Sequence, residues 1–510
     1  MPDEDCFQRI VTIDNIRSAW VKARHYARTE EFYFDAHAYR RFEEHLEAKL
    51  AGLQHELLDG TYRPSPLRQV LIPKGEQIRR LYFLSPRDSV VIQAAMNVVG
   101  PDFEVGFSPH SYGNRLGVGE HESHQVYRRW QDLYGDYVSA VRRFLNEGPE
   151  AWYLITDIEN CYPSVKLERL RGLIAARIHD ERALELVSSF LGLEAFDSDE
   201  QLQSVEGLPP GALHAHFFAN IYLTELDNLA VEHTLGYARY VDDICFVCRD
   251  ASRLLEAEDR LRHYLERWEH GFKEEKTIRR PVSDWEPLID HTRKLKYARR
   301  LDLVAALDTP SEHIEVVADA ESLLRDLYLV VETSGDVEKL VGDAGFVVAQ
   351  LSRIGASNLQ SVIYALLEVR PLRPSTMRVL LGCLLELELP DPSPRFRLHL
   401  TPSREDGGYV RVSMLQLLPF FSTRAAGMKE ILLGDLCRDP SYLVRATAYM
   451  ALRALVERGA LSVTVEELRD LKEAETSPYA LERLIDCYSV VEGDNAWVAL
   501  VSLLTSGGPA

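Results

Sequence analysis

The sequence has no uninterrupted apolar run of the length, about 18 residues or more, that a helix needs to span a membrane. Residues 1–5 are acidic and are therefore unlike a secretory signal. Cysteine is scarce too, with 7 residues scattered along 510, which fits reduced thiols rather than a disulfide framework. Cys245 and Cys248 form a C-x-x-C pair, but on a strand they would point to opposite faces, which favours core packing over zinc binding. We therefore expect a cytoplasmic protein without a membrane partner.

Positive charge is also in short supply, because 58 Lys and Arg residues face 79 Asp and Glu residues, and the net charge is −21. A net-acidic chain is unexpected for a nucleic-acid enzyme unless its basic residues gather in one place. They gather in residues 276–300, which we interpret as a surface that follows a phosphate backbone, although a solvated helix face is the alternative for any one residue. The residues concerned are Lys276, Arg279, Arg280, Arg293, Lys294, Lys296, Arg299 and Arg300.

The length suggests about three domains. Residues 1–66 are predicted to be a helical extension, because apolar residues recur there at steps of three and four. Residues 67–300 mix predicted strands and helices. Residues 301–510 are predicted to be entirely helical, with helices around 313–333, 337–353, 357–370, 375–389, 465–475, 478–490 and 494–504.

A pair of adjacent carboxylates, Asp242 and Asp243, lies between two apolar runs that predict the strands of a hairpin. On a tight turn these side chains repel each other unless a cation lies beside them, and oxygen ligands favour magnesium. A solvated turn is the alternative. A third carboxylate, Asp157, ends a predicted buried strand over 152–157.

Four motifs follow one another along the chain: the strand that ends at Asp157, the Pro/Gly turn and helix of 207–223, the hairpin of 240–243, and Lys276. This order resembles the palm of reverse transcriptases, whose third motif is a Tyr-x-Asp-Asp box. The resemblance implies an α+β fold with the palm and fingers of a right-hand polymerase, followed here by an all-α helical-repeat domain.

The resemblance also implies a two-metal site. Polymerisation uses two Mg²⁺ ions, for which Mn²⁺ can substitute, about 3.5–4 Å apart. Asp157 and Asp242 are the expected bridging ligands, with Asp243 and the carbonyl of Ile158 as further ligands. Lys276 is expected beside the leaving pyrophosphate, either as general acid or as a counter-charge.

A nucleotide pocket follows from the same resemblance. Predicted strands over 67–72 and 78–84 correspond to the fingers hairpin, whose basic residues hold the incoming triphosphate: Lys74, Arg79 and Arg80. Tyr162 lies where reverse transcriptases place an aromatic ring under the sugar. Such a ring collides with a 2′-hydroxyl and selects deoxynucleotides, which argues against an RNA polymerase, although an aromatic core residue is the alternative.

Two stretches depart from the family pattern. Most reverse transcriptases have Leu-Pro-Gln-Gly and then Ser, whereas this chain has Pro210 before Gly211 and Ala215 in place of the Ser. Pro210 and Gly211 are still expected to line the nucleotide pocket, and the replacements are compatible with unusual template use. The box over 110–115, with Arg115 expected to contact nucleic acid, has Asn114 in place of the usual aromatic residue.

The tail completes the resemblance. Residues 439–452 resemble a HEAT-type repeat, and a palm followed by such a tail resembles bacterial defence-associated reverse transcriptases of the abortive-infection type. This implies a DNA polymerase of antiphage defence that uses dNTPs and releases DNA. Its synthesis would be template-independent and protein-primed, or templated by an associated non-coding RNA, and the helical repeats would form a homo-oligomer. The alternatives are a retroelement-type RNA-directed DNA polymerase and an inactive palm that acts as a scaffold.

Overall fold

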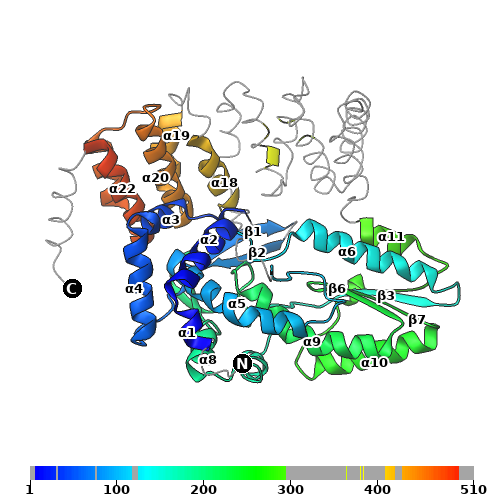
Figure 1. Ribbon diagram of the computed structural model, residues 1–510. Coiled ribbons are helices and arrows are strands. Elements are labelled where there is room, and N and C mark those ends of the chain that lie inside the picture. Colours follow the sequence, from blue (N-terminus) through cyan, green and yellow to red (C-terminus); the bar gives the residue numbers. More distant parts are fainter. Residues whose placement is uncertain are drawn as a thin grey trace, which may run out of the picture. The chain divides into compact units, whose positions relative to one another are not determined.

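The computed structural model describes residues 6–29, 33–74, 77–117, 124–293, 408–419 and 428–492, with isolated positions between 348 and 383 (Figure 1). The chain divides into two compact units. The first comprises residues 1–69, 81–197 and 202–295, and the second comprises 70–80, 198–201 and 296–510. Among the described residues, no helix combines the length and the apolar character that a membrane span requires.

Four helices begin the first unit: α1 (Cys6–Ile10), α2 (Ile13–Thr29), α3 (Ala36–Glu43) and α4 (Leu46–Leu58). Within the predicted helical extension of residues 1–66, the apolar residues from 39 to 57 are divided between α3 and α4. His45, between α3 and α4, adopts a left-handed backbone with φ of 66°, which ends α3 and turns the chain into α4. Trp20 of α2 stacks on Phe42 of α3 with ring centroids 5.0 Å apart, so these helices pack through aromatic contacts.

The first sheet has the order β2-β1-β4-β5. Its strands are β1 (Leu67–Lys74), β2 (Gln77–Phe83), β4 (Glu194–Phe196) and β5 (Leu202–Ser204). The two strands predicted around residues 67–84 are confirmed. Leu67 and Arg68 pair in parallel with β4, a short strand that the sequence analysis did not predict.

The second sheet carries the acidic motifs and has the order β6-β7-β3-β8, with every pairing antiparallel. Its strands are β3 (Trp152–Asp157), β6 (Gly236–Tyr240), β7 (Asp243–Cys248) and β8 (Ile278–Pro281). The predicted strand over 152–157 and the predicted hairpin are confirmed. Cys245 and Cys248 belong to different hydrophobic clusters, so they face opposite sides of the sheet as predicted, and neither forms a disulfide.

Helices cover both faces of this second sheet: α6 (Trp130–Arg143) and α11 (Glu286–Arg293) on one, and α9 (Ala215–His233) and α10 (Ala251–Glu266) on the other. The helices α5 (Pro86–Gly106), α7 (Leu167–Ala175) and α8 (Glu181–Ser188) pack against other helices. On one face, Tyr153 and Ile155 join a core with residues of α6 and with Leu288 of α11. On the other face, Leu154 belongs to the large core that includes α9 and α10. The alternation of side chains along β3 therefore buries both of its faces.

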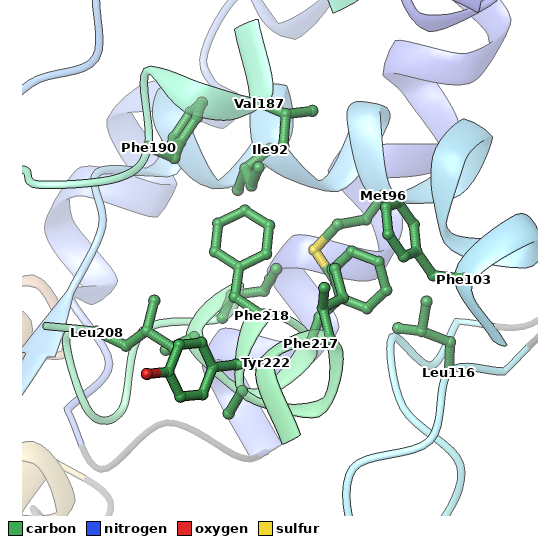
Figure 2. Close-up of a cluster of buried hydrophobic side chains, with 14 of the residues drawn as sticks. Ile92, Met96, Phe103, Leu116, Val187, Phe190, Leu208, Phe217, Phe218 and Tyr222 are labelled. Atoms are coloured by element: carbon green, nitrogen blue, oxygen red, sulfur yellow. The ribbon is translucent and has the colours of Figure 1, made fainter. Parts of the chain in front are cut away.

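The start of α9 is fixed in that large core. Figure 2 shows Phe217 and Phe218 among Ile92, Met96 and Phe103, all of which are buried. The rings of Phe103 and Phe217 meet edge to face with centroids 5.6 Å apart. This close packing gives the residues before Phe217 a rigid support.

The described part of the second unit is helical. It contains α18 (Tyr409–Leu417), α19 (Lys429–Gly434), α20 (Tyr442–Glu457), α21 (Val465–Ala474) and α22 (Pro478–Glu492). The helices predicted at 465–475 and 478–490 coincide with α21 and α22. The helices predicted at 313–333, 337–353, 357–370, 375–389 and 494–504 lie outside the described residues, apart from isolated positions. Arg445 and Glu475 form a partly buried ion pair of 2.8 Å that links α20 to the end of α21.

Candidate active site

The acidic hairpin turn has an unusual backbone. Tyr240 pairs with Asp243, so Val241 and Asp242 form the turn between β6 and β7. Val241 has φ of 60°, a conformation that a β-branched residue rarely adopts. The amide of Ile158 donates to the carbonyl of Asp242 at 3.0 Å, and Asp157 pairs in register with Asp243. The structure thus brings all three predicted carboxylates together.

The loop over 110–115 packs against this turn. The amide of Tyr112 donates to the carbonyl of Arg239 at 2.8 Å, and Ser111 forms a parallel bridge with the same residue. A Cβ on Gly113 would lie 2.7 Å from the amide nitrogen of Val241. Glycine is therefore required at 113, because any side chain there would push the turn away.

The three carboxylates create an excess of negative charge. Burial, together with the charges of Asp157 and Asp243, raises the pKa of Asp242 to about 7. Within the described residues, no group of three His, Cys, Asp or Glu side chains is arranged to hold a metal ion. The chemistry of the site nevertheless fits magnesium, because these ligands are hard oxygens whose mutual repulsion a divalent cation would relieve.

Lys276 supplies positive charge to the site. Its ammonium forms an ion pair with Oδ2 of Asp157. The amide of Lys273 donates to the carbonyl of Asp157 at 2.8 Å, which fixes this segment beside the end of β3. Burial alone would lower the pKa of Lys276, but the bond to Asp157 and the charges of Asp243 and Asp242 raise it, so the lysine stays charged.

A buried arginine, which the sequence analysis did not identify, supports the turn. Arg239 is only 1% exposed and forms two 2.7 Å bonds to the carboxylate of Asp227 on α9. It also donates to Ser111 Oγ and to the carbonyl of Val241, both at 2.8 Å. The signal in the sequence was a charged residue inside an otherwise apolar strand, where burial requires a partner.

The second motif contacts the strand-to-helix turn after β3. The amide of Leu208 donates to the carbonyl of Tyr162 at 2.9 Å, and a Cβ on Gly207 would collide with that same carbonyl. Tyr162 is partly buried, and its hydroxyl lies 2.6 Å from Nδ1 of His216. His216 was not among the predicted site residues.

Pro210 and Gly211 lie against β2. The carbonyl of Pro210 accepts from the amide of Tyr82 at 2.8 Å, and Gly211 has φ of 91°. The position that carries Gln in most of the family is therefore used here as a backbone acceptor, which proline can supply. Arg79 and Arg80 are exposed on β2, and the side chain of Lys74 lies outside the described residues.

The residues predicted to contact nucleic acid differ in their surroundings, and two of them have carboxylate partners within the protein. Arg115 is partly buried and pairs with Glu104 at 2.8 Å, and Arg279 bonds to the buried Glu258 at 2.6 Å. Arg280 is exposed. The side chains of Arg293, Lys294 and Lys296 lie outside the described residues. Contact of this group with nucleic acid stays a prediction.

In a comparison with known protein families, residues 72–283 match the family model described as reverse transcriptase (RNA-dependent DNA polymerase). Protein YkfC of Escherichia coli (strain K12) is 30% identical over 196 residues, which are 38% of this chain and 49% of YkfC. The group II intron-encoded protein LtrA of Lactococcus lactis subsp. cremoris is 25% identical over 195 residues, which are 38% of this chain and 30% of LtrA. The chain thus spans less than half of either relative.

Among solved structures, telomerase from Candida tropicalis is similar with a TM-score of 0.33 and 14% identity, covering 46% of this chain and 55% of that one. All four motifs, from Asp157 to Lys276, lie within the range that the family model matches. Residues 72–283 of the chain are therefore similar to the reverse transcriptase family.

Proposed function

We propose that this chain is a DNA polymerase that joins deoxynucleotides at the site formed by Asp157, Asp242 and Asp243. The observation that carries the proposal is the register of β3 against β7, which brings Asp157, at the end of one central strand, opposite Asp243, at the start of the other. Reverse transcriptases depend on divalent metal ions, and the clustered carboxylates suit that requirement.

In the proposed mechanism, Asp157 and Asp242 would hold two magnesium ions, with Asp243 and the carbonyl of Ile158 as further ligands. When bound, these ions activate the primer hydroxyl and neutralise charge on the phosphates. Lys276 adds a counter-charge on the side where pyrophosphate leaves. Arg79 and Arg80, with Lys74, are assigned to the triphosphate.

Selection of the sugar is assigned to Tyr162. Its ring is partly buried after the end of β3, and the charge of Asp242 contributes to raising its pKa, after burial and Cys161. This influence supports a position near the metal ligands. A 2′-hydroxyl would collide with the ring, so the proposed substrates are dNTPs.

The test is a labelling assay on the purified full chain with magnesium and each labelled dNTP, both without nucleic acid and with an annealed RNA template and DNA primer. The matched control is Asp242→Asn/Asp243→Asn, which keeps side-chain size and removes the charge. DNA made by the wild type and not by the control supports the proposal. No label under either condition contradicts it and favours an inactive scaffold.

The finer proposal is a role in antiphage defence, with protein-primed, template-free synthesis or an associated non-coding RNA as template. It is supported by the sequence order of palm and helical tail and by Pro210 and Ala215. Protease would shift the product if a protein hydroxyl primes it, whereas RNase pretreatment would abolish synthesis from a bound RNA. In cells, phage plaque counts should fall with the wild type and not with Asp242→Asn.

In the protein-primed alternative a tyrosine hydroxyl would start the DNA, and helices α20 and α22 contain four tyrosines that are candidates. Tyr442, Tyr449, Tyr479 and Tyr488 are all buried, with exposed fractions of 1–6%. Priming by any of them would require local opening of α20 or α22. The proposed homo-oligomer is tested by measuring the mass of the purified chain in solution.

A second candidate is a retroelement-type RNA-directed DNA polymerase. The similarity to an intron-encoded protein over residues shared with LtrA favours it. In the labelling assay this function predicts synthesis only when an RNA template and a primer are supplied, and no effect on phage plaques.

A further inference from the structure

Tyr162 and His216 form a hydrogen-bonded pair. The tyrosine hydroxyl lies 2.6 Å from Nδ1 of the histidine, and the two rings meet edge to face with centroids 5.6 Å apart. Burial lowers the pKa of His216 to about 4 and raises that of Tyr162 well above its usual value. The bond therefore joins two neutral groups at physiological pH.

His216 is itself held in place from two directions. The ring of Tyr127 lies edge to face on it at 5.9 Å, and the hydroxyl of Tyr127 donates to the carbonyl of Leu213 at 2.5 Å. The next two residues, Phe217 and Phe218, are buried in the core shown in Figure 2. The imidazole is thus a fixed point from which a neighbouring side chain can be oriented.

The main chain of Tyr162 is fixed as well. Its carbonyl accepts from the amides of Leu208 and Val165, at 2.9 and 3.3 Å. With the backbone fixed, the remaining freedom of the residue is rotation of its side chain. The bond to His216 removes that freedom, because the hydroxyl reaches Nδ1 only over a narrow range of side-chain torsions.

We propose that His216 is a positioning residue for sugar selection: its hydrogen bond to Tyr162 holds the aromatic ring where a 2′-hydroxyl would collide with it. This inference rests on the proposed role of Tyr162. A ring that can move by a fraction of an ångström makes room for the 2′-hydroxyl of a ribonucleotide. A ring whose hydroxyl is held by a hydrogen bond does not. His216 would act through Tyr162 and would not touch the nucleotide.

The experiment compares the ratio of kcat/KM for dCTP to that for CTP in the full chain, on an annealed template and primer. His216→Leu removes the hydrogen bond, and His216→Asn keeps a polar group near the position of Nδ1. Tyr162→Phe removes the same bond from the other side. We expect His216→Leu and Tyr162→Phe each to lower the ratio by about three- to tenfold, the effect of one net hydrogen bond, and His216→Asn to retain most of it.

The double variant Tyr162→Phe/His216→Leu should lower the ratio no further than either single change, because both remove one bond. A purely structural role for His216 would lower kcat/KM for both nucleotides and leave their ratio unchanged, which would overturn the inference. If His216→Leu fails to fold in a thermal unfolding control, Tyr162→Phe alone decides.

Tyr162→Ala distinguishes the role of the Tyr162 ring from the role of His216. If it lowers the ratio while His216→Leu and Tyr162→Phe do not, sugar selection by the ring stands and the role of His216 is wrong. If Tyr162→Ala leaves the ratio unchanged, the proposed role of Tyr162 is itself wrong, and the inference about His216 falls with it.

Discussion

At the scale of single residues, the strongest feature is the crowding of three carboxylates. The pKa of Asp242 is raised from an ordinary value of 3.8 to about 7, so the folded state binds its proton more tightly than the unfolded state. The metal-free protein should therefore lose stability as pH rises from about 4 to above 7. The sequence predicted Asp157 at the end of a strand and Asp242 and Asp243 on a hairpin turn, and it predicted the repulsion between the two adjacent carboxylates.

Asp242→Asn should remove that loss. In EDTA we expect the difference in free energy of unfolding between this variant and the wild type to grow, in favour of the variant, by about 2–3 kcal/mol from pH 5 to pH 8. Thermal unfolding across this range measures the difference. Glu159→Gln, which neutralises an exposed carboxylate two residues after Asp157, is the control and should show no such trend. An equal difference at both pH values would contradict the prediction.

Lys276 can act through its charge or by donating a proton, and two substitutions together distinguish these roles. Because its pKa is raised, we expect the charge to matter more. Lys276→Arg should then keep a substantial part of the polymerisation rate, whereas Lys276→Met should lower it by about 100-fold, a typical loss for such a group. Single-turnover rates on a primed template measure both. Equal losses in the two variants would favour the general acid.

Two contacts at this scale were beyond sequence analysis. His216 and Arg239 act through hydrogen bonds to residues that are distant along the chain, 54 positions for His216 to Tyr162 and 128 for Arg239 to Ser111. Local patterns carry no record of such partners. Only the anomaly of an arginine in a buried strand pointed toward one of them.

At the scale of elements, the hairpin of β6 and β7 is shaped by what surrounds it. Arg239 links β6 to α9 through Asp227, and Gly113 lets a neighbouring loop approach Val241. The strands themselves were predictable from their apolar, β-branched composition. The three-residue strands β4 and β5 were not, since their pairing partners rather than their composition define them.

Arg239→Gln should weaken both the hairpin and the fold. Removing one partner of a buried ion pair leaves Asp227 uncompensated, and we expect a loss of about 3 kcal/mol in the free energy of unfolding. Arg253→Gln is the matched control, because its partner Glu256 is exposed on α10, and it should cost less than about 1 kcal/mol. Urea denaturation compares the two. Similar losses would show that the buried network contributes little.

Gly113→Ala tests the approach of the loop to the turn. The added methyl would lie 2.7 Å from the amide nitrogen of Val241, so the turn must shift and polymerisation should fall at least about tenfold. Gly135→Ala, on α6 with open space around it, is the control and should stabilise the helix by about 0.5–1 kcal/mol without loss of activity. Full activity of Gly113→Ala would show that the turn position is not critical.

At the scale of the whole molecule, each of the two units has its own buried ion pair. Arg239 and Asp227 lie in the first unit, and Arg411 and Asp439, at 2.9 Å, lie in the second. We expect calorimetry to resolve two unfolding transitions. Arg239→Gln should lower one and Arg411→Gln the other, whereas a single transition lowered by both variants would mean that the units unfold together.

The net charge of −21 is also a property of the whole molecule. From the sequence we could predict only that basic residues gather in one segment of an acidic chain. Arg115 and Arg279 have carboxylate partners within the fold, which no count of charges reveals. Periodicity likewise predicted α21 and α22, while the HEAT-like character of the tail stays a prediction.

The left-handed turn at Val241 has a consequence for how this family is read from sequences. Valine does not favour that backbone, so the conformation is imposed by Arg239 and by the loop at Gly113. Other residues at position 241 are therefore expected to keep the same turn geometry. Residues outside the turn determine its backbone conformation, and a comparison limited to the four residues of the box would overlook them.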